Sequence, residues 1–243
     1  FKPLLFQQIS RVQIMKYFVT LSLLSLLFFS CKKENEFAYT ITGEAKILKE
    51  GQAIFLELEN ENGMTPIDTA VVKNGVFIFE GTQTEPELHF ISFKDLVSKV
   101  PIIIEKGNIS IEIKGDTLPN KMISYENSIT KGTFNNDELY KFRNEGTRAV
   151  KLEMKAFERV NNQKMIEAQQ SKDTTVINAL QKEYQGFVDR IENFNNTYID
   201  KNPSSYVSVL LLEDMIYNPT SDLKKLTKQF NQLSAELRNT KKG

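Results

Sequence analysis

Two runs of β-prone residues meet at a turn dipeptide in residues 69–81, Thr69-Ala70-Val71-Val72-Lys73-Asn74-Gly75-Val76-Phe77-Ile78-Phe79-Glu80-Gly81. Asn-Gly readily adopts the positive φ angles of a type I′ turn, and such a turn joins adjacent antiparallel strands. This stretch therefore predicts a β-hairpin, and with it a β-rich first half of the chain.

Similar short runs lie on both sides of this stretch. Apolar residues alternate with polar ones in 53–59, another β-prone run occupies 88–93, and residues 100–105 and 109–115 flank a second turn at Lys106-Gly107-Asn108. Seven or eight strands at this spacing are typical of a sandwich or barrel. We therefore expect an antiparallel β-sandwich or barrel over residues 37–132.

The period of the apolar residues changes after Phe134. Seven of them recur at gaps of three and four on one helix: Ile177, Leu180, Tyr184, Phe187, Ile191, Phe194 and Tyr198. A second helix is expected near 137–168, and Ser171-Lys172-Asp173 separates the two, so they should form an antiparallel hairpin. The fold class that follows is α+β, with a helical region over 133–240.

Two further helices are expected after the hairpin. Asn202-Pro203 has the composition of a helix start, with Asn as the cap and Pro in the first turn, and the last helix should span roughly 221–237. The helix over 203–217 is apolar nearly all round, so it should be buried on more than one side. It is the best candidate surface for a protein partner or for self-association.

Composition excludes several kinds of chemistry. The 243 residues carry 31 basic and 31 acidic side chains, a balance that argues against nucleic-acid binding. A single Cys cannot form a Cys-x-x-Cys pair, and a single His cannot form a two-His metal motif. His89 should be an ordinary sheet residue, and the paired strand carboxylates should face solvent. We therefore expect no catalytic residue, metal site or cofactor, and no enzymatic activity of the chain itself.

The N-terminus has the features of an export signal. Met15-Lys16 and the apolar run that follows it predict a signal peptide over 15–30, after an upstream extension over 1–14. Cys31 then begins a charged tether over 31–36, and this arrangement resembles a lipobox, although Phe28 and Phe29 depart from the usual residues. Cys31 is thus the expected lipid-attachment site. Ordinary secretion and an uncleaved anchor remain as alternatives.

Several short motifs resemble one family when they are taken in order along the chain. They are Ile41-Thr42-Gly43, Ile67-Asp68-Thr69-Ala70, Asn74-Gly75 with the run to Gly81, Pro86, and Ile104-Glu105-Lys106-Gly107-Asn108-Ile109. This pattern resembles the domain of unknown function at the N-terminus of Bacteroidetes-type thioredoxin-like lipoproteins. Asn202-Pro203-Ser204-Ser205-Tyr206 and Phe230-Asn231-Gln232-Leu233 look like the region that joins this domain to a redox domain, so the resemblance covers about 37–240.

The resemblance implies a cell-envelope protein of the thiol–disulfide oxidoreductase kind, lipid-anchored in the outer membrane and facing the periplasm, with surface exposure also open. The thioredoxin-like domain that carries the catalysis is missing from the chain. The leading hypothesis is therefore a non-catalytic module that positions or dimerises a redox domain or binds a partner protein. The alternatives are a stand-alone glycan- or peptide-binding lipoprotein and a fragment of an oxidoreductase.

Three Asp-Thr-x triplets resemble O-glycosylation acceptors of this bacterial group. The acceptor residues would be Thr69, Thr117 and Thr174. Asp-Thr pairs also occur in turns and at helix caps, so turn or cap chemistry is the alternative interpretation of all three.

Overall fold

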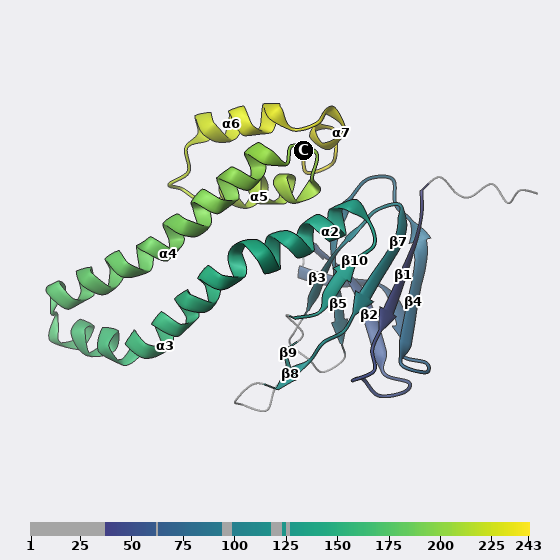
Figure 1. The fold of residues 1–243 in the computed structure, drawn as a ribbon, viewed down its shortest axis with the longest axis horizontal. Coiled ribbons are helices and arrows are strands. Elements are labelled where there is room, and N and C mark those ends of the chain that lie inside the picture. Colours follow the sequence, from purple (N-terminus) through teal and green to yellow (C-terminus); the bar gives the residue numbers. More distant parts are fainter. Residues whose placement is uncertain (1–36, 62, 94–98, 118–122, 125–126) are drawn as a thin grey trace, which may run out of the picture. The chain divides into compact units, whose positions relative to one another are not determined.

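Eight of the described strands build two four-stranded sheets that share one apolar core. The structure is a computed structural model that describes residues 37–61, 63–93, 99–117, 123–124 and 127–243. The first sheet has the order β10-β7-β1-β4 and the second the order β3-β2-β5-β6 (Figure 1). Their bounds are β1 (Ala38–Glu44), β2 (Ala53–Asn60), β3 (Gly63–Val71), β4 (Val76–Thr82), β5 (Glu87–Phe93), β6 (Val100–Ile104), β7 (Gly107–Glu112) and β10 (Ile129–Lys131). Strands β8 (Asp116–Thr117) and β9 (Ile123–Ser124) form a separate short pair. The expected sheet region at the N-terminal end is confirmed.

Alternation along the strands fills the core. In β4, Phe77 and Phe79 are 1% and 2% exposed, whereas Ile78 between them is 54% exposed. The two buried rings meet edge to face at 5.8 Å between centroids, an arrangement that aromatic pairs favour. The opposite sheet supplies buried branched residues such as Ile54 and Ile91 to the same cluster. In β4 one face therefore belongs to the core and the other to solvent. Strand β6 is buried on both faces, with Ile102 and Ile104 in this core and Ile103 in a second cluster with the helices.

The turn at Asn74-Gly75 forms as expected, but the strands on either side of it do not pair as a hairpin. Asn74 and Gly75 have φ angles of 54° and 73°, and Lys73 and Val76 exchange two backbone hydrogen bonds. Beyond this bridge, β3 joins one sheet and β4 the other. The hairpin prediction is wrong, since β4 pairs with β1 and β3 pairs with β2, each as the edge strand of a different sheet.

The second expected hairpin is wrong for a similar reason. Gly107, at φ 121°, starts β7 directly after β6 has ended, and the chain crosses from the second sheet to the first. There β7 pairs in parallel with β1 and places Ile109 opposite Ile41. The remaining ladders in the two sheets are antiparallel. Both turns are thus connections between the sheets, and they hold the two layers of the core together.

Helices make up the second half of the chain. They are α2 (Phe134–Lys141), the π-helical segment η2 (Phe142–Thr147), α3 (Arg148–Ser171), α4 (Thr174–Lys201), α5 (Tyr206–Ile216), α6 (Leu223–Gln232) and α7 (Ala235–Arg238). The expected antiparallel hairpin is formed by α3 and α4, which lie side by side (Figure 1). Lys172 makes the left-handed turn between them, and the Asp173 carboxylate caps α4 by accepting from two backbone N–H groups. None of the described helices combines the length and apolar character needed to span a bilayer.

Two expected helix boundaries are wrong. The cap of α5 is Ser205 rather than Asn202, because the Asn202 amide donates back to the carbonyl of Tyr198 and so ends α4. The last helix is divided into α6 and α7, because Ser234 is extended and its hydroxyl caps the second segment. The Ser234 N–H also donates to the carbonyl of Pro203, which ties the break to the start of α5.

Two adjacent asparagines fasten the helices to the second sheet. The Asn136 amide accepts from the Ile103 N–H at 3.0 Å and donates to the Ile103 carbonyl at 2.6 Å, so it satisfies the free edge of β6. The Asn135 amide donates to Glu105 at 2.6 Å and accepts from the backbone N–H of Tyr206 at 2.7 Å. Asn135 therefore connects the sheet to the first turn of α5.

Candidate functional site

Helix α5 is divided between a buried start and an exposed end. Tyr206, Val207, Val209 and Leu212 are buried in the second apolar cluster of the molecule. At the other end, Ile216 is 58% exposed and the adjoining Tyr217 is 80% exposed. The expectation that this helix is buried on several sides holds for its first half only.

Helix α6 lies against α5 with its apolar stripe. Asp222 caps the helix by accepting from the N–H groups of Lys224 and Lys225, and Leu226 is buried in the same cluster as α5. Leu223, in the first turn, is 65% exposed. The outward side carries three exposed lysines, Lys224, Lys225 and Lys228. The helix is therefore amphipathic, with a basic polar side.

The segment after α7 returns to α5 and to the sheet. The ammonium of Lys242 lies 2.6 Å from both carboxylate oxygens of Glu213 on α5. The Lys241 backbone N–H donates to Glu85, and its ammonium is 3.7 Å from Glu87 on β5. These contacts hold residues 241–243 against α5.

A groove of about 520 Å³ lies among these three segments. We call it the α5–α6 groove, and its lining residues are Val209, Leu212, Glu213, Ile216, Tyr217, Leu223, Leu226, Thr227, Phe230, Leu233, Lys241, Lys242 and Gly243. Most of them are apolar, and the most exposed apolar ones lie at the end of α5 and the start of α6. Such a groove is suited to bury the apolar side of a helix or extended peptide.

Charge is unevenly distributed around this groove. Residues 222–243 hold six basic and two acidic side chains, a net charge of +4. Residues 31–221 hold 22 basic and 29 acidic side chains, a net charge of −7. The segment that forms one wall of the groove is therefore basic, although the chain as a whole is neutral. The two lysines of this segment that line the groove, Lys241 and Lys242, are paired with Glu87 and Glu213.

His89 on β5 and Tyr206 on α5 are buried titratable groups, and the Glu87 carboxylate acts on both. His89 on β5 is 2% exposed, and burial lowers the pKa of its imidazole, although the Glu87 carbonyl and carboxylate act in the opposite direction. Burial raises the pKa of the Tyr206 hydroxyl, and the carboxylates of Glu87, Glu213 and Glu85 raise it further. His89 and Tyr206 are thus neutral, buried side chains.

The Tyr198 hydroxyl joins three helices. It donates to Glu138 on α2 at 2.9 Å and lies 3.0 Å from the hydroxyl of Ser205, the cap of α5. Burial raises the pKa of this phenol, which therefore stays protonated and able to donate. The contact positions α5, and with it the groove, relative to the end of α4. The sequence pattern did not single out Asn135 or Asn136, and it named Tyr198 only as a member of the apolar seam of the helix.

The residues expected from the sequence are not brought together. Cys31 lies outside the described residues, as do the signal peptide, the tether and the upstream extension. Thr69 and Thr174 are both exposed, at the end of β3 and the start of α4, and Thr117 lies in β8. Asp173, in the triplet of Thr174, acts as a helix cap. Exposure of Thr69 and Thr174 is compatible with modification and equally with turn or cap chemistry, so O-glycosylation of the three threonines stays a prediction.

Within the described ranges, no three His, Cys, Asp or Glu side chains gather closely enough to hold a metal ion. The charged groups that line the groove are paired, since Lys242 contacts Glu213 and Lys241 approaches Glu87. What this arrangement offers chemically is an apolar binding surface.

Comparison with known proteins identifies the sheet region. No curated protein and no solved structure matches the chain. One protein family matches residues 39–139, a range that begins in β1 and ends in α2 and so includes Asn135 and Asn136. Residues 39–139 are a domain of unknown function, of the family DUF4369.

Proposed function

We propose that this chain is a non-catalytic, lipid-anchored module of the cell envelope that binds a partner protein, or positions a redox domain, at the α5–α6 groove. The observation that carries the proposal is the groove itself, in which Ile216, Tyr217 and Leu223 keep more than half of their surface exposed. Exposed apolar patches with a polar rim are typical of interaction sites.

The energetics favour a protein as the occupant. Fully burying a large apolar side chain contributes roughly 1.5–3 kcal/mol, so covering three of them supplies a useful share of a micromolar affinity. Tyrosine is enriched among the residues that dominate binding energy, and Tyr217 is the most exposed large apolar side chain of the described residues. The buried half of α5 keeps these side chains on a rigid helix, which limits the entropy that binding costs.

The link to thioredoxin-like lipoproteins rests on the motif resemblance. It supports a redox domain as the partner and an envelope location, with Cys31 as the lipid-attachment site. The groove itself is mainly apolar, and the two lysines that line it are paired with carboxylates, which favours an apolar partner surface. A partner of this kind would bring the catalytic cysteines, since the chain has only one Cys.

The glycan- or peptide-binding alternative finds less support in the sheets. Sugar-binding sheets usually present flat aromatic rings to solvent. In the described strands, Tyr39, Phe55 and Phe90 are half-buried, and Phe77, Phe79 and Phe93 are buried. The other alternative, a piece of a thiol–disulfide oxidoreductase, rests on the same resemblance as the leading proposal and assigns the chemistry to a thioredoxin-like domain rather than to residues 37–243.

Site-specific photo-crosslinking tests the groove. A photoreactive phenylalanine analogue replaces Tyr217 in the full chain, in the cells that produce it, and in a control it replaces Phe134, which is 57% exposed outside the groove. We expect one discrete adduct from position 217, lost when Leu223→Asp is added, and none of the same mass from position 134. Identical adducts from both positions, or none from 217, would contradict the proposal.

An insulin-reduction assay tests the non-catalytic part. The purified full chain should reduce insulin at the background rate, because Cys31 cannot form a redox pair with a second thiol of the same chain. Turnover above background that is lost in Cys31→Ala would overturn this part of the proposal and leave the groove untouched.

A further inference from the structure

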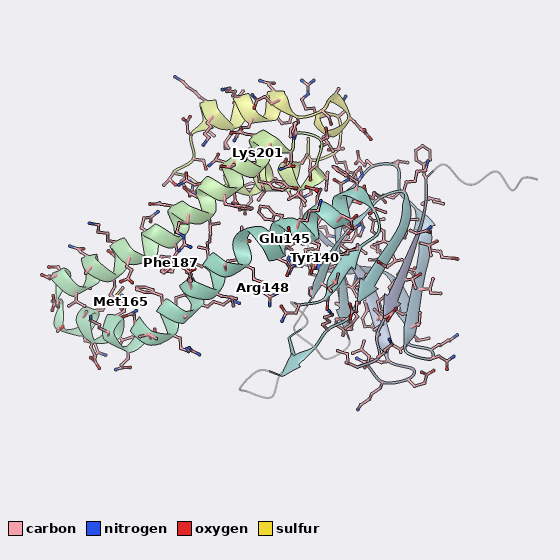
Figure 2. All side chains as sticks on the ribbon, viewed as in Figure 1. Tyr140, Glu145, Arg148, Met165, Phe187 and Lys201 are labelled. Atoms are coloured by element: carbon pink, nitrogen blue, oxygen red, sulfur yellow. The ribbon has the colours of Figure 1, made fainter. Side chains whose placement is uncertain are left out.

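Three of the four outer strands of the two described sheets have a blocked edge. On β6, the Asn136 amide bonds to both backbone groups of Ile103. Strand β10 has three residues and is followed by α2, and the Lys131 ammonium of β10 lies 4.4 Å from the ring centroid of Tyr140 on α2 (Figure 2 labels Tyr140). Strand β3 contains Pro66 and has a register shift in its pairing with β2. Short strands, lysines, prolines and bulges all keep a sheet edge from pairing with another chain.

Strand β4 is the fourth outer strand and has none of these features. Its seven residues include no proline and no lysine, and its register with β1 runs without a shift from Val76 to Thr82. No described strand lies on its other side. Ile78, near the middle of β4, is 54% exposed. A long, regular edge with an exposed apolar residue is suited to strand addition.

The pairing with β1 decides which backbone groups of β4 are free. The Gln83 N–H donates to the Phe37 carbonyl, and the Ala45 N–H donates to the Gly75 carbonyl. These bonds join residues that stand opposite each other when the register of β1 and β4 is extended, so the odd-numbered residues of β4 bond to β1. The N–H and C=O groups of the even-numbered residues therefore point to the other side.

Three even-numbered residues of β4 are available for a further strand. Val76, next to the turn, exchanges two backbone hydrogen bonds with Lys73. Ile78, Glu80 and Thr82 have no neighbouring strand among the described residues on that side, and we call them the β4 edge. Each can exchange two hydrogen bonds with the opposite residue of an antiparallel strand. An extended backbone supplies donors and acceptors at this two-residue repeat, so the β4 edge is suited to an extended segment.

Charge at the β4 edge favours a basic segment. Glu80 is exposed and is the one charged residue of β4. The Tyr39 hydroxyl lies over Gly81, where a Cβ would meet it at 2.5 Å. Burial raises the pKa of this phenol, and the Asp68 carboxylate of β3 raises it further. A Lys or Arg would be attracted to these carboxylates, whereas the β4 of a second copy would bring another Glu80 and no basic side chain.

We propose that the β4 edge binds an extended segment of another protein, which adds to the first sheet as a fifth strand, antiparallel to β4. The segment carries a basic residue opposite Glu80 and, two residues later, an apolar residue opposite Ile78. Opposite-charge pairs and apolar pairs across neighbouring strands both stabilise a sheet. This site is separate from the α5–α6 groove, because no residue of β4 lines that groove.

Hydrogen exchange at single-residue resolution tests the strand addition. The full chain is measured in membranes of the cells that produce it and after purification in detergent. In the purified chain, the three amides of the β4 edge should exchange faster than those of Phe77 and Phe79, which bond to β1. In the membranes, the β4 edge should slow by about tenfold or more, while Phe77 and Phe79 stay unchanged. Slowing of every second amide is the pattern that an added strand produces.

Charge reversal tests the choice of a basic segment. Glu80→Lys should restore fast exchange of the β4 edge in the membranes. Glu59→Lys, on an exposed residue of β2 in the other sheet, is the matched control and should keep the slow exchange. Leu223→Asp, in the α5–α6 groove, should also keep it, so the two sites are tested separately. Unchanged exchange of Phe77 and Phe79 shows that the sheet of each variant is folded.

Three results would overturn the proposal. The first is equal exchange of the β4 edge in membranes and in the purified chain. The second is slow exchange of the β4 edge in the purified chain, because a second copy or the chain itself would then supply the strand. The third is an equal effect of Glu80→Lys and Glu59→Lys, because charge at the edge would then not select the segment.

Discussion

At the scale of single residues, the junction between sheet and helices depends on side-chain amides. Asn136 is fully buried and serves both backbone groups of Ile103 at the edge of β6, which would otherwise be unsatisfied. The Asn135 amide likewise uses both of its groups, since it donates to Glu105 and accepts from the N–H of Tyr206. At Ile103, the free edge of β6 is therefore hydrogen-bonded to a side chain instead of to another strand.

We predict that Asn136→Ala lowers the free energy of unfolding by about 2–4 kcal/mol, because it leaves two buried backbone groups of Ile103 without partners. Urea denaturation followed by circular dichroism measures the change. The control is Asn144→Ala, whose half-buried amide bonds within its own helix, and which should cost less than about 1 kcal/mol. Equal costs for the two variants would contradict the role of the junction.

His89 gives a prediction of pH dependence. Burial lowers its pKa in the folded state, so the unfolded chain, with a pKa of about 6.5, binds the proton more readily. The contribution of neutral His89 to the free energy of unfolding is therefore fully present above about pH 6.5 and is lost as the pH falls through the folded-state pKa. Glu87 and Lys241 are the charged groups that act on it, in opposite directions.

His89→Gln should remove this part of the pH dependence. The free energy of unfolding of the wild type, minus that of the variant, should fall as the pH is lowered below about 6.5. A difference that stays constant or rises over that range would show that His89 is not held neutral. The sequence predicted an ordinary sheet residue, and the neutral, buried imidazole is consistent with that expectation.

At the scale of elements, the sequence predicted which strands and helices form better than it predicted which strands pair. Periodicity and Asn-Gly chemistry are local, so strand positions, the turn at Asn74-Gly75 and the α3–α4 hairpin could be predicted. Pairing depends on contacts between strands remote in sequence: β4 pairs with β1, and β3 pairs with β2 in the other sheet. Local signals could not show that both predicted hairpins connect two sheets.

The candidate site was predictable in part. The apolar composition of 203–217 singled out α5, but its exposed end at Ile216 and Tyr217 depends on where α6 starts and on where α4 stops. Asn202 has the composition of a cap for α5, yet its amide returns to Tyr198. The break at Ser234 and the contact of Lys242 with Glu213 depend on tertiary contacts, and a periodic sequence pattern cannot predict these.

Two helical glycines, Gly146 in η2 and Gly186 in α4, predict opposite effects of one substitution. A Cβ on Gly146, in the π-helical segment, would overlap the ring of Phe194, whereas one on Gly186 meets nothing within 4 Å. Replacing helical Gly by Ala usually stabilises by about 0.5–1 kcal/mol. We expect that gain for Gly186→Ala and a net loss for Gly146→Ala, since Phe194 packs on Phe142 at 5.5 Å.

Thermal or urea unfolding of both variants checks the sign. A stabilised Gly146→Ala would show that the Phe194 ring moves aside without cost, and that the π-helical segment is not needed to make room for it. A destabilised Gly186→Ala would show that the open side of α4 is covered in solution.

At the scale of the whole molecule, the expected lipid anchor stays a prediction, because Cys31 lies outside the described residues. Cys31→Ala should move the protein from the membrane fraction to the soluble fraction of fractionated cells. Cys31→Ser serves as a second variant with nearly the same volume. Persistence of both variants in the membrane fraction would contradict lipid attachment at this residue and favour an uncleaved apolar anchor.

The α5–α6 groove carries the function that we propose, the binding of a partner protein or the positioning of a redox domain. The sheet domain of residues 39–139 holds the start of α5 in place through Asn135, and Asn136 ties α2 to β6. An assembly of this kind needs no catalytic residue in the chain itself.

Hydrogen exchange of α6 tests the central claim, that the α5–α6 groove is covered by a partner in the cell. The full chain is measured in membranes of the cells that produce it and after purification in detergent, with the β2–β3 ladder as an internal reference. Amides of Leu223–Gln232 should exchange at least tenfold more slowly in the membranes, while the reference is unchanged. Equal exchange of α6 in both samples would contradict the account.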